Sequence, residues 1–187
     1  MHILPLAHIN IAQAAIKKVA FMVLAVIALV CAHANASELM VQTGVVTRVV
    51  DGDTMWVLLQ GRSKPLKVRL EGIDAPEICQ SGGVRAQTAL SHWIMGQSVT
   101  VTTRAHDDYG RTVGTVYLQG QDVARWMVGN GHAWVYVFRS KKGPYSDEFA
   151  RAQTERRGVF GDTQAQEPRL FRKANGACYM SAYRPTK

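Results

Sequence analysis

Carboxylate residues occur in two short segments where a structural role does not account for all of them. Segment 51–54, D-G-D-T, carries a tight-turn signal, and Asp53 is an additional carboxylate where the next strand starts. Segment 68–77 places Asp74 and Glu77 on either side of a proline, so both side chains can project from one rigid turn. Paired carboxylates suit a hard cation such as Ca²⁺, or a general base beside it. Each segment alone is also compatible with an ordinary hairpin turn or a solvated acidic loop.

Two arginines accompany these carboxylates. Arg69 lies in segment 68–77, and Arg111 follows the polar segment D-D-Y-G at 107–110. A guanidinium group binds phosphate oxygens in a bidentate way that lysine cannot reproduce. A phosphodiester gains negative charge in the transition state of its hydrolysis, which a cation and two such groups would stabilise. Taken alone, 107–111 is better explained as a polar turn followed by a surface arginine.

Strand patterns dominate the chain, with helical patterns inserted between and after them. The expected strands are 41–50, 53–59, 65–73, 97–104, 111–118 and 132–138. The expected helices are 84–95, 122–128 and 146–157. This order predicts a mainly β (α+β) fold, an OB-type five-stranded β-barrel with about three α-helices.

Length and composition limit the class of protein. The chain has 187 residues, a formal net charge of +8, 47% hydrophobic residues and 19% charged residues. There is enough apolar material to bury one core, so a disordered polyelectrolyte is excluded. The basic excess favours a polyanionic partner, either nucleic acid or an anionic membrane surface.

The N-terminus has the features of an export signal. Two lysines precede an apolar run at 19–32, and small residues at Ala34 and Ala36 offer a cleavage site. We therefore expect a signal peptide at 1–36 and a mature domain at 37–187, with its core at about 41–162 and a C-terminal tail at 163–187. Export would lead to the periplasm or the medium. An uncleaved N-terminal anchor and a later start at Met22 remain alternatives.

Two cysteines follow the predicted signal peptide, Cys79 and Cys178. A disulfide can persist in an exported protein, and this pairing would tie the loop beside Glu77 to the C-terminal tail. Two free thiols are the alternative, because sequence does not show whether the two Cα atoms approach each other.

Four motifs resemble, in order and approximate spacing, those of the staphylococcal nuclease (thermonuclease, or micrococcal nuclease) family. They are V-V-D-G-D-T (49–54), V-R-L-E-G-I-D-A-P-E (68–77), D-Y-G-R (108–111) and G-H-A-W-V-Y-V-F (131–138). The resemblance implies an OB-fold barrel with three helices, one Ca²⁺ ion per active site, and endonucleolytic hydrolysis of DNA and RNA. It also implies products that carry 3′-phosphates.

The resemblance also implies roles for individual charged residues. Asp53 and Asp74 match the calcium-binding carboxylates, and Ala75 matches a position that supplies its backbone carbonyl to the ion. Arg69 and Arg111 match the two arginines that bind phosphate.

The general base and the nucleotide site are implied in the same way. Glu77 matches the glutamate usually assigned to activate the attacking water. Tyr109 and Tyr136 match aromatic residues that line the nucleotide site. Phe138 stands where the family has a second tyrosine, which removes one hydroxyl group from that site.

These observations favour an exported, Ca²⁺-dependent, sugar-nonspecific endonuclease that acts on DNA and RNA. We expect a monomer whose mature form does not associate with membranes. The main alternative is a non-catalytic OB module that binds single strands through basic and aromatic side chains. Such a module has no use for Asp53, Asp74 and Glu77 together, since their charge would repel phosphate. A phosphatase and a membrane-surface binder are weaker alternatives.

Overall fold

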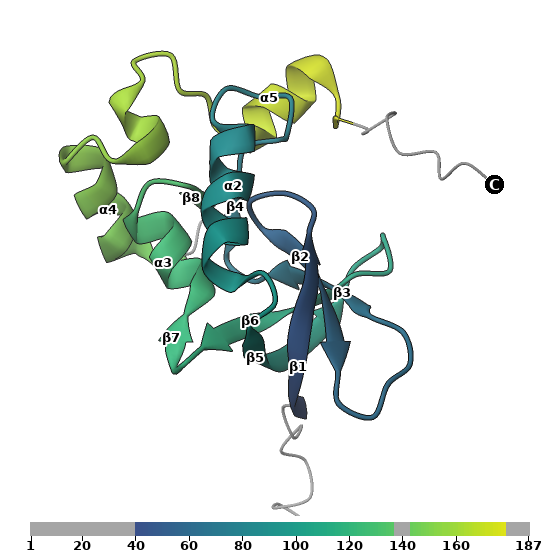
Figure 1. Ribbon diagram of the computed structural model, residues 1–187. Helices are drawn as coiled ribbons and strands as arrows, with labels where there is room; N and C mark the ends of the chain where they lie inside the picture. Colours follow the sequence, from purple (N-terminus) through teal and green to yellow (C-terminus); the bar gives the residue numbers. More distant parts are fainter. Residues whose placement is uncertain (1–39, 137–142, 179–187) are drawn as a thin grey trace, which may run out of the picture. The chain divides into compact units, whose positions relative to one another are not determined.

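In the computed structural model, which describes residues 40–136 and 143–178, five strands close into a barrel (Figure 1). They are β1 (Met40–Val49), β2 (Thr54–Leu59), β3 (Leu66–Leu70), β5 (Ser98–His106) and β6 (Thr112–Leu118). The order around the barrel is β3-β2-β1-β5-β6, and a parallel pairing of β3 with β6 closes it. All other neighbours in the barrel are antiparallel. This arrangement confirms the predicted OB-type α+β fold.

The β1–β2 hairpin forms at the predicted Asp-Gly turn. Val49 pairs with Met55, and the backbone N–H of Val50 donates to the carbonyl of Thr54 at 2.8 Å. Alternate strand residues point inward, as the pleat requires. The fully buried side chains include Val46, Met55, Val57, Leu59, Val68, Leu70, Leu90, Ile94, Val99, Val101 and Met127.

The strand predicted at 65–73 is interrupted. β3 ends at Leu70, and the chain resumes extended structure only in β4 (Ile73–Asp74). Gly72 has a φ of +77°, a left-handed conformation that glycine adopts without steric cost and that ends a strand. The turn directs β4 away from the barrel into a separate two-stranded sheet with β8 (Trp134–Val135).

The strand predicted at 132–138 is shorter in the structure than expected, within the described residues. β8 contains two residues, and Trp134 pairs with Asp74 of β4. Residues 137 and 138 lie outside the described part of the chain. The pairing places Asp74 at the end of a two-stranded sheet beside the barrel.

The three predicted helices form, as α2 (Gly83–Ile94), α3 (Val123–Gly129) and α4 (Ser146–Thr154). The short strand β7 (Gln121–Asp122) precedes α3, and the 3-10 turn η2 (Gly158–Gly161) follows α4. The side chain of Asp122 caps α3 by accepting the Arg125 N–H at 3.1 Å. α2 lies along one side of the barrel, with α3 and α4 beyond it (Figure 1).

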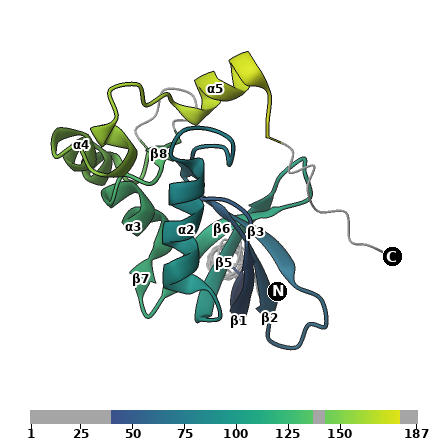
Figure 2. The ribbon, with the colours of Figure 1, turned by 45° about the horizontal axis from the view of Figure 1, so that its top comes forward.

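A fourth helix, α5 (Pro168–Asn175), lies in the segment that the sequence suggested was a tail. It begins with Pro168 in the first turn, where a missing N–H costs nothing, and ends before Gly176. In both ribbon views α5 lies beside the loop that precedes α2 (Figure 2). A disulfide joins Cys178, after α5, to Cys79 in that loop, with 5.9 Å between the two Cα atoms.

The predicted signal peptide, residues 1–36, lies outside the described residues. Among the helices of the described segments, none has the length and apolar character needed to cross a membrane.

Candidate active site

Asp53 lies at the end of the β1–β2 turn and is 3% exposed. One carboxylate oxygen, Oδ1, accepts hydrogen bonds from the Thr54 hydroxyl and from Nη1 of Arg69, each at 2.8 Å. The other, Oδ2, accepts the backbone N–H of Ala75 at 3.1 Å. Gly52 permits this close approach, because a Cβ atom there would lie 2.7 Å from Cβ of Ala75. The turn is thus packed directly against the segment that follows β4.

Arg69 connects the two aspartates that the sequence singled out. Its Nη1 lies 2.8 Å from Oδ1 of Asp53, and its Nη2 lies 3.1 Å from Oδ1 of Asp74. The charge of Asp53 raises the pKa of Arg69, outweighing burial, and Asp74 adds to the effect. The side chain is 20% exposed, and its Nε donates to no acceptor within the described residues. Arg69 thus bonds to both aspartates and keeps one N–H group without a partner among these residues.

Asp51 adds another carboxyl group at the same corner. Its Oδ1 accepts the backbone N–H of Asp53 at 3.0 Å, the role expected of a turn residue. Burial, and then the neighbouring charge of Asp53, raise the pKa of Asp51 to about 7.

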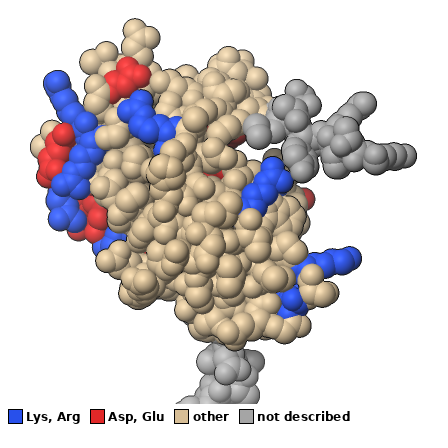
Figure 3. All heavy atoms as spheres, in the orientation of Figure 1, with Lys and Arg blue, Asp and Glu red and all other residues tan. Residues whose placement is uncertain are grey.

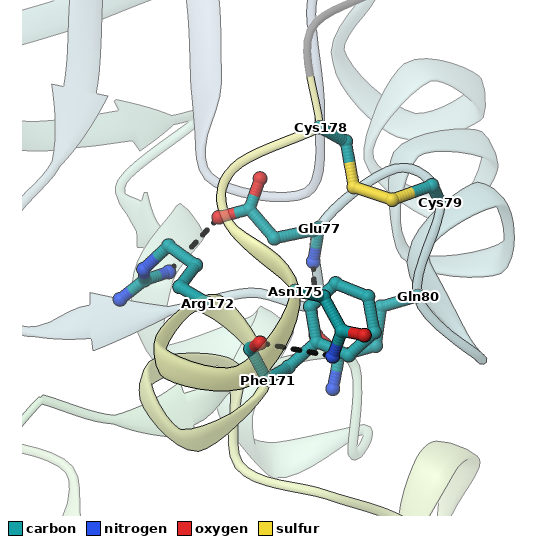
Figure 4. The surroundings of a disulfide bond; sticks show 7 residues. All are labelled: Glu77, Cys79, Gln80, Phe171, Arg172, Asn175 and Cys178. Atoms are coloured by element: carbon teal, nitrogen blue, oxygen red, sulfur yellow. Dashed lines mark hydrogen bonds and ion pairs between the residues drawn. A yellow bond between two sulfur atoms is a disulfide. The ribbon is translucent and has the colours of Figure 1, made fainter.

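Glu77 begins a tight loop that leads into α2. Its backbone N–H donates to Oε1 of Gln80 at 3.2 Å, and its carbonyl accepts the Gln80 N–H at 2.8 Å. A Cβ atom at Gly83 would lie 1.9 Å from the Glu77 carbonyl oxygen, so only glycine fits there. The glutamate is therefore held by its own loop, with its carboxylate directed toward α5 (Figure 4).

Arg172 of α5 also bonds to the site carboxylates, and the sequence motifs did not predict this. Its Nη1 lies 3.0 Å from Oε1 of Glu77, and its Nη2 lies 2.8 Å from Oδ2 of Asp74. Hydrogen bonding to Asp74 raises the pKa of Arg172 despite partial burial. The sequence signal that could have predicted this contact is the pair Cys79–Cys178. Cys79 is two residues from Glu77, so a disulfide to Cys178 brings the residues just before Cys178 close to Glu77.

Arg111 is not bonded to the carboxylates of this cluster within the described residues. Its Nε instead lies 2.7 Å from Oδ2 of Asp107, whose pKa is lowered because hydrogen bonds from Arg111 outweigh burial. Val113 pairs with Arg69 in the parallel β3–β6 ladder. Arg111 precedes Val113 by two residues and lies directly before β6, so Arg69 and Arg111 come from neighbouring strands of the barrel.

The predicted aromatic residues flank these groups. Tyr109 is 83% exposed, and the guanidinium of Arg111 lies 5.2 Å from its ring centroid. The backbone N–H of Tyr136 donates to the carbonyl of Gly72 at 2.9 Å, which places this 45% exposed residue beside β4. Phe138 lies outside the described residues.

The donor set fits a hard cation with few protein ligands. Asp53 and Asp74 are buried carboxylates bonded to one guanidinium, and the backbone carbonyl of Ala75 follows directly in the chain. No group of three or more His, Cys, Asp and Glu residues suited to a metal occurs in residues 40–136 and 143–178. Two carboxylates suit Ca²⁺ if water and substrate oxygens complete its shell of six to eight ligands.

Charge on the visible face of the molecule is mixed. Figure 3 shows acidic and basic side chains adjacent to one another along the edge over α3 and α4, and a largely uncharged centre. Glu148, for example, pairs with both Arg125 and Arg151. On this face the basic side chains therefore do not form a continuous track.

An OB barrel whose rim carries buried carboxylates together with arginines has the groups that hydrolysis of a phosphodiester requires. Residues 67–159 match the family described as Staphylococcal nuclease homologue. The chain is 38% identical over 144 residues to Micrococcal nuclease of Shigella flexneri, covering 71% of this chain and 81% of the relative. It is 37% identical over 143 residues to Protein ParB of Escherichia coli, covering 70% and 78% of the two chains.

An Uncharacterized endonuclease of Haemophilus influenzae is 35% identical over 128 residues, covering 68% of this chain and 71% of that one. The chain belongs to the staphylococcal nuclease family, which confirms the resemblance carried by the four sequence motifs. It is accordingly a nuclease, an enzyme that hydrolyses phosphodiesters in nucleic acids.

Proposed function

We propose that the protein is an exported, Ca²⁺-dependent endonuclease that hydrolyses DNA and RNA without regard to the sugar and leaves 3′-phosphate ends. The observation that carries this proposal is the bonding of Asp53 and Asp74 to one guanidinium, that of Arg69, with Glu77 close by. Among the described residues, Asp53, Asp74 and Glu77 share two guanidinium groups, those of Arg69 and Arg172. The remaining negative charge would repel a nucleic-acid phosphate unless a further cation bound there. A module that only binds single strands gains nothing from these carboxylates.

Asp53, Asp74 and the carbonyl of Ala75 would hold the cation. When bound, it would polarise the scissile phosphate and stabilise its additional negative charge. Arg69 in β3 and Arg111, just before β6, would bind the phosphate oxygens.

Glu77 would accept a proton from the attacking water, whose oxygen forms the new bond to phosphorus. The bond from phosphorus to the 5′ oxygen would break, and that oxygen would take up a proton from solvent, so the products are a 3′-phosphate and a 5′-hydroxyl. Tyr109 and Tyr136, both exposed beside this region, would contact the nucleotide.

The decisive experiment compares cleavage of denatured DNA and of RNA with Ca²⁺, with excess chelator and after restoration of Ca²⁺. We expect activity on both substrates, complete loss with chelator, recovery with Ca²⁺ and 3′-phosphate ends. Mg²⁺ should substitute poorly, because it requires a strict octahedron and releases water reluctantly. Equal cleavage in chelator would contradict the calcium mechanism, and binding without cleavage would favour the OB module.

Export is supported by the features of residues 1–36 and by the disulfide, because disulfides persist in oxidising compartments. The N-terminus of exported protein is expected near Ser37. Intact Met1 in a membrane fraction would contradict cleavage of a signal peptide.

A further inference from the structure

Arg172 bonds to both carboxylate oxygens of Asp74. Its Nη1 lies 3.1 Å from Oδ1 and its Nη2 lies 2.8 Å from Oδ2, a parallel, bidentate pair. Oδ1 also accepts Nη2 of Arg69, so two donors already occupy that oxygen. The Asp74 side chain is only 4% exposed, whereas that of Arg172 is 31% exposed. A cation that binds Asp74 therefore has to compete with the guanidinium of Arg172.

The same guanidinium neutralises the predicted general base. Nη1 of Arg172 lies 3.0 Å from Oε1 of Glu77 (Figure 4). One side chain thus contacts two of the carboxylates that the proposed reaction requires.

The position of α5 depends on connections to the loop 77–83. The disulfide Cys79–Cys178 is one, and the hydrogen bond from Nε2 of Gln80 to the carbonyl of Gln166, at 2.6 Å, is another. The helix contributes little to the core, since Pro168 is its only buried residue and Leu170 is 51% exposed. Without the covalent connection, hydrophobic packing would retain α5 only weakly.

We propose that Arg172 competes with the divalent cation for Asp74, and that the Cys79–Cys178 disulfide maintains this competition by fixing α5 over the site. This inference rests on the cation site of the proposed function. Opening the disulfide releases α5, removes Arg172 from Asp74 and Glu77, and increases cation affinity. Cation affinity is then linked to the redox state of one bond.

The experiment measures Ca²⁺ affinity by isothermal titration calorimetry of the full exported chain, without nucleic acid. Arg172→Gln should bind Ca²⁺ at least about tenfold more tightly, because a unit positive charge adjacent to a dication is removed. Arg172→Lys retains the charge but not the bidentate geometry, so its affinity should be intermediate. Arg169→Gln is the matched control, an exposed arginine of the same helix, and should stay within about twofold of wild type.

Reduction of the disulfide completes the test. In the wild type, reduction or Cys178→Ser should tighten Ca²⁺ binding, whereas reduction should leave the affinity of Arg172→Gln unchanged. Circular dichroism establishes that each protein remains folded under the conditions of the titration.

Unchanged affinity in Arg172→Gln would overturn the inference, and weaker affinity would show instead that Arg172 positions the carboxylates. A reduction effect of equal size in wild type and Arg172→Gln would overturn the role of the disulfide. Absence of Ca²⁺ binding from every protein, Arg172→Gln included, would overturn the cation site itself. Failure of the proposed function is thereby distinguished from failure of this inference.

Discussion

Oδ2 of Asp53 accepts the backbone N–H of Ala75 at 3.1 Å, across 22 residues of sequence. This hydrogen bond joins the turn after β1 to the segment after β4, which are the two places where the site carboxylates arise. The geometry of the site therefore depends on the same atoms that would hold the cation. Substitutions at these positions should affect activity and stability together.

Asp53→Asn should abolish Ca²⁺-dependent cleavage and lower the free energy of unfolding by about 2–4 kcal/mol. Asparagine lacks the negative charge of aspartate. Its NH₂ group would also face an N–H donor, that of Arg69 or of Ala75, from which the wild-type carboxylate accepts a hydrogen bond. Cleavage assays and urea denaturation measure the two effects. Asp147→Asn, an exposed residue of α4, should leave activity unchanged; loss of activity there would mean that any acidic residue matters.

Arg69→Lys and Arg111→Lys should each reduce kcat about tenfold to a hundredfold. Lysine retains the positive charge but cannot form two parallel hydrogen bonds to the phosphate, whose negative charge grows in the transition state. Arg62→Lys, in the exposed turn after β2, is the control and should have no effect. Steady-state kinetics would contradict a built phosphate site if all three variants showed equal, small losses.

Glu77→Gln should reduce kcat about a hundredfold or more while Ca²⁺ affinity stays near that of the wild type. Glutamine fits the same loop but cannot accept the proton of the attacking water. Single-turnover cleavage at saturating Ca²⁺ measures the chemical step, and calorimetry measures binding. Retention of full activity would assign proton transfer to another group.

The stability of the protein should fall on acidification partly through His132. Burial, and then the charge of Arg85, lower the pKa of His132 below its usual value of 6.5. Below pH 6.5 the unfolded chain takes up the proton first, so stability is lost as the pH falls toward the lowered pKa.

His132→Phe keeps the ring stacked on Trp126, 5.6 Å away between centroids in the wild type, and removes the titration. Its melting temperature should therefore decrease less between pH 7 and pH 5 than that of the wild type. His92→Phe, at an exposed position of α2, is the matched control. Parallel melting curves for wild type and His132→Phe would exclude this contribution.

Local features of the chain were readable from the sequence alone. The Asp-Gly turn, the alternating strands and the three central helices follow from backbone preferences and hydrophobic periodicity over a few residues. Four candidate site residues were recognisable because turns and strands do not need charged groups at their positions: Asp53, Arg69, Asp74 and Glu77. Family membership followed from four such motifs in series.

Contacts between distant segments were decided only by the tertiary structure. The left-handed turn at Gly72 converts one predicted strand into β3 and β4 and takes Asp74 out of the barrel sheet. Glycine at position 72 permits this turn, but the contacts of Asp74 with Arg69 and Arg172 depend on which segments pack against one another.

Arg172 illustrates this division most clearly. Its type and its helix are ordinary, and in sequence it is separated from Asp74 by 98 residues. The sequence alone determined that an arginine occurs in the C-terminal segment and that a cysteine follows it. Only the folded chain, with α5 held beside the loop of Cys79, brings that guanidinium to the carboxylates, because proximity across a hundred residues is a property of packing and crosslinking rather than of local sequence.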